Sequence, residues 1–217
     1  MIKVLRGVGL ALMALVVIAF AVVSVSGSSL LPRLERMAGL VPTDTGSGTV
    51  AGVPIGGPFT LTNAATGATV TDQTYRGHWM LVYFGYTFCP DVCPTDLQKI
   101  FAAFKLLGPK ADTITPLFVT VDPSRDTAPA LARYVALFSP RLIGLTGSQA
   151  ATDSVVSAYR VYVEKVPGTA GAPYLVNHSA FIYLMNPDGK LAAVYPPDVP
   201  AADLAHQLGQ AVSAPAS

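Results

Sequence analysis

The residues with the greatest capacity for chemistry are Cys89 and Cys93, the only two cysteines in 217 residues. Three residues separate them, and Pro94 follows directly. A pair at this spacing either makes and breaks a disulfide, forms a plain structural disulfide, or holds a soft metal ion such as copper(I). Because two sulfurs alone are a poor cage for an ion, the metal interpretation requires a third ligand.

The elements around the pair place it at a strand-to-helix junction. The apolar run 80–84 is typical of a buried strand, and a helical pattern follows the cysteines. Pro94 suits the first turn of that helix and Gly108 suits its end. We therefore expect Cys93 near the helix N-cap and Cys89 on the loop before it. Both sulfurs would lie in the positive field of the helix N-terminus, which favours thiolate over thiol.

Three histidines are available as a third ligand. His78 comes before the strand, at the end opposite the cysteines, and His206 is expected on the solvent face of the last helix. His178 directly precedes the apolar strand 180–184. In a thioredoxin-like sandwich this approach loop faces the cysteine loop, so His178 is the favoured candidate, although an ordinary structural role stays open.

The rest of the pattern alternates strands with helices. It predicts an α/β thioredoxin-like sandwich, with a central mixed sheet flanked by helices. Ser148 suits the N-cap of one of these helices. The expected strands are 58–62, 68–72, 80–84, 116–121, 142–145, 180–184 and 190–195, and the expected helices begin near 94, 127, 149 and 201.

The N-terminal segment has the pattern of a membrane helix. Lys3 and Arg6 precede an uncharged run, 7–25, that is close to the roughly 20 residues needed to cross a bilayer. We expect an uncleaved transmembrane anchor rather than a signal peptide, whose apolar core is usually shorter. The predicted organisation is anchor or signal 1–26, linker 27–55, folded domain 56–213 and tail 214–217.

Charge and compartment narrow the function classes. The formal net charge is +1, and only 12% of residues are charged, so no basic patch is expected and nucleic acid is excluded as a partner. The anchor predicts an exported domain. In an oxidising compartment a lone cysteine pair is most often a structural disulfide, so that interpretation stays open.

Three stretches resemble the Sco (SenC-type) family of copper-binding proteins. They are 85–97, which holds both cysteines, 121–127, and 174–189, which holds His178. The likeness runs from about 56 to 208. Members of this family are membrane-tethered, thioredoxin-like proteins that help to assemble the dinuclear copper centre of cytochrome c oxidase subunit II.

The resemblance implies that Cys89, Cys93 and His178 bind one copper ion, as Cu(I) or Cu(II). It implies a carrier rather than an enzyme, anchored by one pass in a bacterial inner membrane with its domain in the periplasm. Its partners would be oxidase subunit II, an upstream copper donor and a thiol reductant. The alternative is a thiol-disulfide oxidoreductase that reduces the oxidase cysteines, for which His178 would be dispensable. A peroxidase is disfavoured, because no arginine is placed to activate a peroxide.

One departure from the family pattern bears on the metal. The family usually has an aspartate before the histidine, and this chain has Asn177. An amide keeps hydrogen-bonding capacity but adds no negative charge beside the ligand. We therefore expect weaker stabilisation of Cu(II) than in aspartate-bearing relatives, with Cu(I) less affected.

The segment 122–126 has two interpretations. In one, Asp126 or Thr127 caps a helix and Arg125 forms a surface ion pair. In the other, the segment contacts the oxidase subunit or a copper donor, and Arg125→Ala would leave copper binding intact while reducing oxidase assembly. Asp91 and Asp96 are expected to satisfy the helix N-terminus.

The remaining residues near the motifs are given structural roles. Tyr86 and Phe88 are interpreted as packing residues. Met80 and Met185 are expected in the core rather than on copper. The loop 165–173, rich in Gly and Pro, is predicted to move over the site.

Overall fold

The computed structural model describes residues 54–168 and 171–213. The predicted anchor, most of the predicted linker and the predicted tail lie outside these residues. Among the residues described, none of the helices combines the length and the apolar character that crossing a membrane requires.

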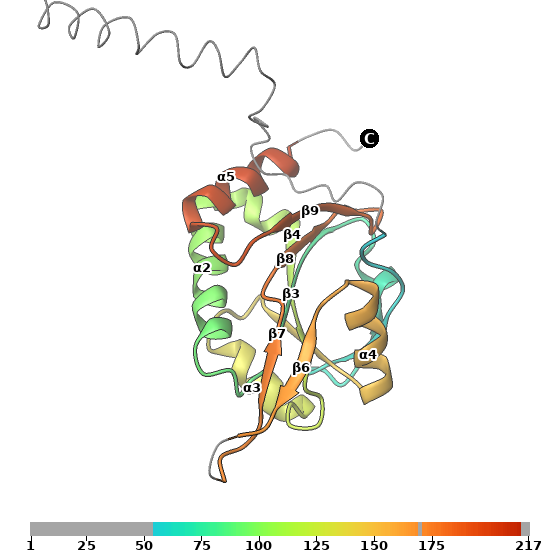
Figure 1. The fold of residues 1–217 in the computed structure, drawn as a ribbon. Helices are drawn as coiled ribbons and strands as arrows, with labels where there is room; N and C mark the ends of the chain where they lie inside the picture. Colours follow the sequence, from blue (N-terminus) through green and yellow to red (C-terminus); the bar gives the residue numbers. More distant parts are fainter. Residues whose placement is uncertain (1–53, 169–170, 214–217) are drawn as a thin grey trace, which may run out of the picture. The chain divides into compact units, whose positions relative to one another are not determined.

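A mixed seven-stranded sheet forms the centre of the domain, in the order β2-β1-β5-β4-β3-β8-β9 (Figure 1). The pairs β3–β4 and β4–β5 are parallel, and the other neighbours are antiparallel. The predicted mixed sheet is therefore confirmed. Its strands are β1 (Thr60–Asn63), β2 (Thr69–Thr71), β3 (Trp79–Gly85), β4 (Ile114–Thr120), β5 (Ile143–Thr146), β8 (Ile182–Met185) and β9 (Leu191–Tyr195).

The central strands are apolar because helices cover both faces of the sheet. Every residue of β3 except Trp79 is buried. β4 begins two residues earlier than predicted and includes Pro116. Pro116 lies opposite Leu81 of β3. The pairing of β4 with β5 starts one residue later, at Leu117 and Ile143, so this proline has no partner in β5.

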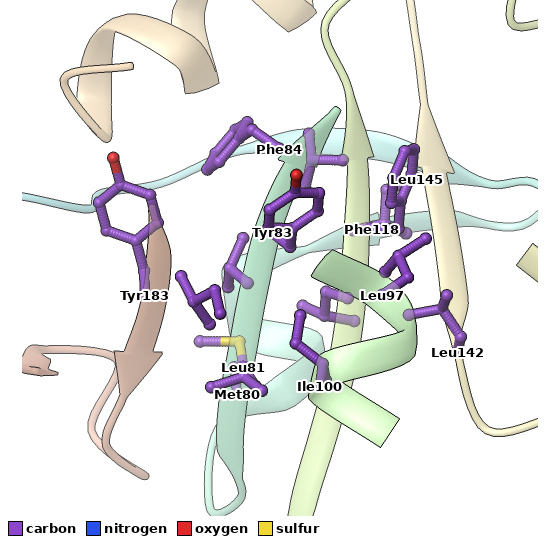
Figure 2. Packing of buried hydrophobic residues seen from close by; sticks show 14 of the residues in the cluster. Met80, Leu81, Tyr83, Phe84, Leu97, Ile100, Phe118, Leu142, Leu145 and Tyr183 are labelled. Atoms are coloured by element: carbon purple, nitrogen blue, oxygen red, sulfur yellow. The ribbon is translucent and has the colours of Figure 1, made fainter. Parts of the chain in front are cut away.

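Helices α2, α3 and α5 cover one face of the sheet, and α4 covers the other (Figure 1). Figure 2 shows Leu97 and Ile100 of α2 lying over the sheet, where both are buried. On the opposite face, the ring of Phe84 lies 5.2 Å from that of Tyr159, at the end of α4. The helices are α2 (Val92–Leu107), α3 (Ala128–Ala136), α4 (Gln149–Ala158) and α5 (Ala201–Ala211), with short 3-10 helices η1 (Asp72–Tyr75) and η2 (Gly108–Thr113).

Two predicted helix boundaries are confirmed by their hydrogen bonds. The Ala151 N–H donates to Ser148 Oγ at 3.2 Å, so Ser148 caps α4 as expected. Gly108 ends α2 with a φ of +64°, a left-handed conformation that glycine adopts without strain, and its N–H donates to the Phe104 carbonyl.

A second, two-stranded sheet was not predicted. β6 (Val163–Val166) and β7 (Leu175–His178) pair antiparallel and hydrogen-bond to each other rather than to the seven-stranded sheet. The predictions of a loop at 165–173 and of a loop carrying His178 are therefore wrong in part, because β6 includes residues 165–166 and β7 includes His178. The two strands are short and partly exposed, so they lack the apolar pattern that marks a strand in the sequence.

Candidate metal centre

The fold brings Cys89, Cys93 and His178 together. Their ligand atoms, two sulfurs and one ring nitrogen, all lie within 4.8 Å of one another. Within 54–168 and 171–213, no other group of three potential His, Cys, Asp or Glu ligands converges in this way. Both cysteines are free thiols. His78 and His206 take no part in the cluster, as predicted.

The cysteines occupy the start of α2 and the loop before it. Cys93 is the second residue of the helix and is completely buried, whereas Cys89 is half-buried. The Cys93 N–H donates to Cys89 Sγ at 3.3 Å, so the free N–H groups of the helix N-terminus face the outer sulfur. Asp91 holds the N-cap position.

Gly85, at the end of β3, makes room for the inner sulfur. A Cβ at this position would lie 2.9 Å from Cys93 Sγ and 3.0 Å from the ring of Phe118. A residue larger than glycine would therefore displace a candidate ligand. Sequence reasoning did not single out Gly85, because only the tertiary structure places it against the sulfur.

His178 ends β7 and presents one nitrogen to the cysteines. Its Nε2 lies 3.3 Å from Cys93 Sγ, and its Nδ1 lies 3.1 Å from the Ser179 carbonyl oxygen. Because a carbonyl oxygen only accepts, Nδ1 carries a proton, and in the neutral imidazole the Nε2 lone pair is left for a metal. The ring stands edge-on to Tyr83 and Tyr86, with centroids 6.5 and 5.9 Å away, and these contacts fix its orientation.

The two thiols differ in protonation. A hydrogen bond from Cys93 lowers the pKa of Cys89 to about 4 against the opposing effect of burial, so the outer sulfur is a thiolate at neutral pH. The hydrogen bond to Cys89 and burial raise the pKa of Cys93 above its ordinary value. The prediction that both sulfurs favour thiolate is therefore wrong for Cys93. Burial and the neighbouring negative charge outweigh the helix N-terminus there.

Asp96 belongs to a buried polar chain behind Cys93 rather than to the helix N-terminus. The Tyr83 hydroxyl donates to Asp96 Oδ2 at 2.9 Å, and Lys99 Nζ donates to Asp96 Oδ1 at 2.7 Å. Burial raises the pKa of Tyr83, which keeps this hydroxyl a donor. The Asp91 side chain makes no cap bond either. The expectation that these two carboxylates satisfy the helix N-terminus is therefore wrong.

The centre opens to the surface through a pocket of about 250 Å³, lined by residues that include Cys89, Val92, Leu175, Asn177 and His178. Phe88 lies beside Cys89 in the chain and is 53% exposed, so it is not a core residue, although its ring lies 4.8 Å from the Arg125 guanidinium. Tyr86 is buried as predicted, and its hydroxyl accepts the Val176 N–H at 3.2 Å. Met80 and Met185 are buried in the core and are not part of the cluster, as predicted.

The segment 122–126 is more buried than its sequence indicates. Asp126 is fully buried and does not cap α3, whose N-cap residue is Thr127. The Arg125 side chain is only 16% exposed, and it pairs with the fully buried Asp122. Burial alone would raise the pKa of Asp122, but hydrogen bonds from Ser124, Arg125 and Tyr174 lower it below its ordinary value. The expected N-cap at Thr127 is therefore confirmed, whereas the alternative cap at Asp126 and the surface ion pair of Arg125 are wrong.

The ligand atoms fit a single soft metal ion. Metal–sulfur and metal–nitrogen bonds of about 2.3 and 2.0 Å place neighbouring ligand atoms roughly 3.5–4.5 Å apart around one ion. The observed spread, within 4.8 Å, needs at most a small closing movement. Two thiolates and an imidazole favour copper(I) over hard cations such as magnesium or calcium.

The fold and the site together define a thioredoxin-like protein with a cysteine–cysteine–histidine centre at the start of a helix. The SCO1/SenC family model matches residues 48–213, and the chain belongs to that family. It is 46% identical over 138 residues to the mitochondrial SCO1 homolog of Homo sapiens, which covers 63% of this chain and 46% of the human protein. The chain therefore spans about half the length of that relative.

Solved structures of copper-bound relatives share the fold. ScoI from Bradyrhizobium japonicum with copper bound is 41% identical, with a TM-score of 0.66 over 72% of this chain and 98% of that chain. Yeast Sco1 with copper bound is 32% identical, with a TM-score of 0.70 over 76% of this chain and 91% of that chain. These similarities confirm the predicted thioredoxin-like domain.

Proposed function

We propose that this protein is a copper chaperone that binds one Cu(I) or Cu(II) ion through Cys89, Cys93 and His178. The observation that carries the proposal is the convergence of the two sulfurs and the imidazole nitrogen within 4.8 Å. Membership of the SCO1/SenC family, and the likeness to relatives solved with copper bound, support copper as the ion.

The three residues divide the work of taking up the ion. The Cys89 side chain is a thiolate at neutral pH and lines the pocket, so it makes the first contact with the copper ion. The Cys93 thiol gives up its proton as the second sulfur ligand, which couples copper uptake to proton release. His178 supplies Nε2. With two thiolates and a neutral imidazole, the site carries a charge of −1 with Cu(I) and 0 with Cu(II), so neither state is extreme.

The copper is destined, in this proposal, for the dinuclear centre of cytochrome c oxidase subunit II. Sco proteins act in oxidase assembly, and this supports the assignment. An upstream donor would load the site, and a reductant would keep both thiols reduced. Residues 1–26 would hold the chain in a bacterial inner membrane with the domain in the periplasm. Extraction of membranes at alkaline pH tests the anchor, because an integral helix keeps the chain in the pellet and a cleaved signal does not.

Anaerobic titration tests the copper assignment. The full chain, reduced and kept in a mild detergent, is titrated with Cu(I) against a competing chelator, alongside Cys89→Ser, Cys93→Ser and His178→Ala. One tightly bound ion, lost with either cysteine and weakened with the histidine, is the expected result. Absence of tight binding, or binding indifferent to His178, would overturn the proposed ligand set.

A second candidate function is thiol-disulfide exchange, and the unequal protonation of the two cysteines favours it. The Cys89 thiolate would attack a disulfide of the oxidase subunit and release one partner thiolate. Cys93 would then lose its proton and attack the mixed disulfide, leaving a Cys89–Cys93 disulfide and a fully reduced partner. This reaction does not need His178. Turnover of a disulfide substrate that survives in His178→Ala would therefore favour the reductase over the carrier.

A further inference from the structure

We propose that the segment 121–127, between β4 and α3, is a brace that holds the His178 hairpin against the cysteine loop, with Arg125 as its central positioning residue. The part of this inference that concerns copper rests on the function proposed above. The structural part stands without it.

The hairpin needs such a brace because the main sheet does not hold it. β6 and β7 pair only with each other, and the backbone ladder of the seven-stranded sheet does not extend to them. Their position therefore depends on contacts made by side chains. One of these is the bond from the Val176 N–H to the Tyr86 hydroxyl, at 3.2 Å.

The brace grips the cysteine loop through Asp126. This carboxylate is fully buried and accepts the Thr87 N–H at 3.0 Å and the Thr87 hydroxyl at 2.6 Å. It also accepts the Thr120 hydroxyl at 2.6 Å, which ties it to β4. Thr87 lies two residues before Cys89. These bonds therefore hold the loop from which the outer sulfur projects.

The brace grips the hairpin through Tyr174, which directly precedes β7. Arg125 Nη1 donates to the Tyr174 carbonyl at 2.8 Å, and the guanidinium lies 3.7 Å from the centre of the Tyr174 ring. The Tyr174 hydroxyl donates to Asp122 Oδ1 at 2.8 Å. The segment 121–127 thus contacts the backbone, the ring and the hydroxyl of Tyr174, which lies four residues before His178.

Arg125 contacts both the hairpin and the cysteine loop. Its guanidinium also lies 4.8 Å from the ring centre of Phe88, which is adjacent to Cys89. Its Nε donates to Asp122, whose side chain is fully buried. A planar guanidinium can stack on two rings while it pairs with a carboxylate, and a lysine ammonium cannot do both. The geometry therefore gives Arg125 a role in setting the distance between the sulfurs and the imidazole.

This role reverses an expectation from the sequence. A contact residue for a partner would leave copper binding intact when changed to alanine, whereas a positioning residue would not. Because only 16% of the Arg125 side chain is exposed, little of it is available to a partner. Arg125→Ala is therefore expected to weaken copper binding.

A matched control is available in Arg141. This arginine also donates to backbone carbonyls, those of Ala111 and Ile114, and lies 5.6 Å from the ring centre of Phe104. Arg141 precedes β5 in the chain, and its carbonyl partners lie at or just before the start of β4, the end of that strand away from the metal centre. Arg141→Ala therefore removes a comparable set of contacts without touching the ligand segments.

The first measurement is hydrogen exchange in the metal-free, reduced full chain. Arg125→Ala is expected to raise exchange of the β6–β7 amides by about tenfold or more, as local opening becomes easier. Arg141→Ala should leave these amides unchanged. Arg125→Lys keeps the charge opposite Asp122 and should recover stability but not hairpin protection. Unchanged hairpin exchange in Arg125→Ala would overturn the brace, whether or not the protein binds copper.

The second measurement is a double-mutant cycle for copper affinity. Arg125→Ala should lower affinity roughly 10-fold in the wild-type background, a typical loss for residues that orient ligands. In the His178→Ala background the same change should lower copper affinity by less than about twofold, because the brace sets the position of the histidine relative to the sulfurs and that histidine is absent. Equal losses in both backgrounds would overturn the proposal. If Arg125→Ala does not fold, Tyr174→Phe replaces it; loss of its hydroxyl bond should change the same readouts in the same direction, and no change would count against the brace.

Discussion

The two segments that supply the candidate ligands are held in place in different ways. Cys93 lies in the first turn of a 16-residue helix that packs across the central sheet, and Cys89 lies on the loop before it. His178 ends a four-residue strand in a hairpin that is not paired with that sheet. The inner sulfur is therefore positioned by the main core, whereas the imidazole is positioned by a few side-chain contacts. A copper site built this way has a rigid side and an adjustable side.

The largest expected effect separates these two sides directly. Loss of a core-held sulfur in Cys93→Ser should lower Cu(I) affinity by more than about 100-fold, beyond the range that changes around a ligand produce. His178→Ala should cost roughly 10–100-fold, because two sulfurs still hold Cu(I). Competition titrations give both values. Equal losses would mean that the two sides contribute alike, and the contrast would fail.

A glycine pair tests how rigid the sulfur side is. Gly85→Ala places a methyl group 2.9 Å from Cys93 Sγ, and Gly144→Ala places one 2.9 Å from Leu131 on the same face of the sheet. Both should lower the free energy of unfolding by about 1–3 kcal/mol, the usual cost of overpacking. Only Gly85→Ala should also weaken copper binding. Denaturant unfolding and copper titration check the two effects. Normal copper affinity in Gly85→Ala would show that the segment holding the cysteines is not rigid and can shift to accommodate the added methyl group.

The pH dependence of alkylation tests the unequal thiols. With a pKa of about 4, Cys89 is a thiolate above about pH 5, so its rate should be nearly constant from pH 5.5 to 8 and fall below pH 4. An ordinary thiol, with a pKa near 8.5, would gain about tenfold per pH unit over that range. Rates measured with iodoacetamide on the reduced, metal-free chain decide between these profiles.

Cys93→Ala is the control for that experiment. The hydrogen bond from Cys93 is the largest cause of the lowered pKa of Cys89, so removing it should move the midpoint upward. A midpoint that stays near 4 in this variant would assign the effect to the helix N-terminus instead.

The smallest expected effect lies on the histidine side. Asn177→Asp adds a negative charge beside His178, and Cu(II) affinity should rise about two- to fivefold, as expected for an exposed charge interaction below 1 kcal/mol. Cu(I) affinity should change less. Asn177 is exposed and pairs in register with Glu164 on β6, so Glu164→Gln gives the matched loss of a charge at the same place. If Cu(II) affinity does not rise in Asn177→Asp, the account of this departure from the family is wrong.

Much of the fold could be predicted from local patterns. The buried strand β3, the helix that begins near Pro94, the cap at Ser148 and the glycine end at Gly108 are each encoded within a few residues. Hydrophobic periodicity and capping chemistry act over that range. Local patterns did not predict the hairpin of β6 and β7. Its strands are short and partly exposed, and contacts with segments distant in the sequence hold them in place.

In the candidate site, too, some features could be predicted from local patterns and others depend on tertiary contacts. The cysteine spacing and the apolar strand 180–184 after His178 favoured a meeting of these residues, and the family resemblance implied it. The burial of Arg125 and the bonds of Asp126 to Thr87 depend on side chains 37 and 39 positions apart, which no local pattern reports. The protonation of Cys93 likewise depends on burial and on the neighbouring thiolate.

The sequence by itself therefore determined the α/β class and the cysteine pair at the strand-to-helix junction, and it favoured His178 as the third ligand, a role that the family resemblance implied. Residue type and spacing are enough for the class and the cysteine pair, because these follow from hydrophobic periodicity, local hydrogen bonding and the donor chemistry of sulfur. The tertiary structure alone decided which sulfur is charged, how Gly85 admits the inner sulfur and how the hairpin is held. Those properties arise from desolvation, close packing and long-range hydrogen bonds, which exist only once the chain has folded.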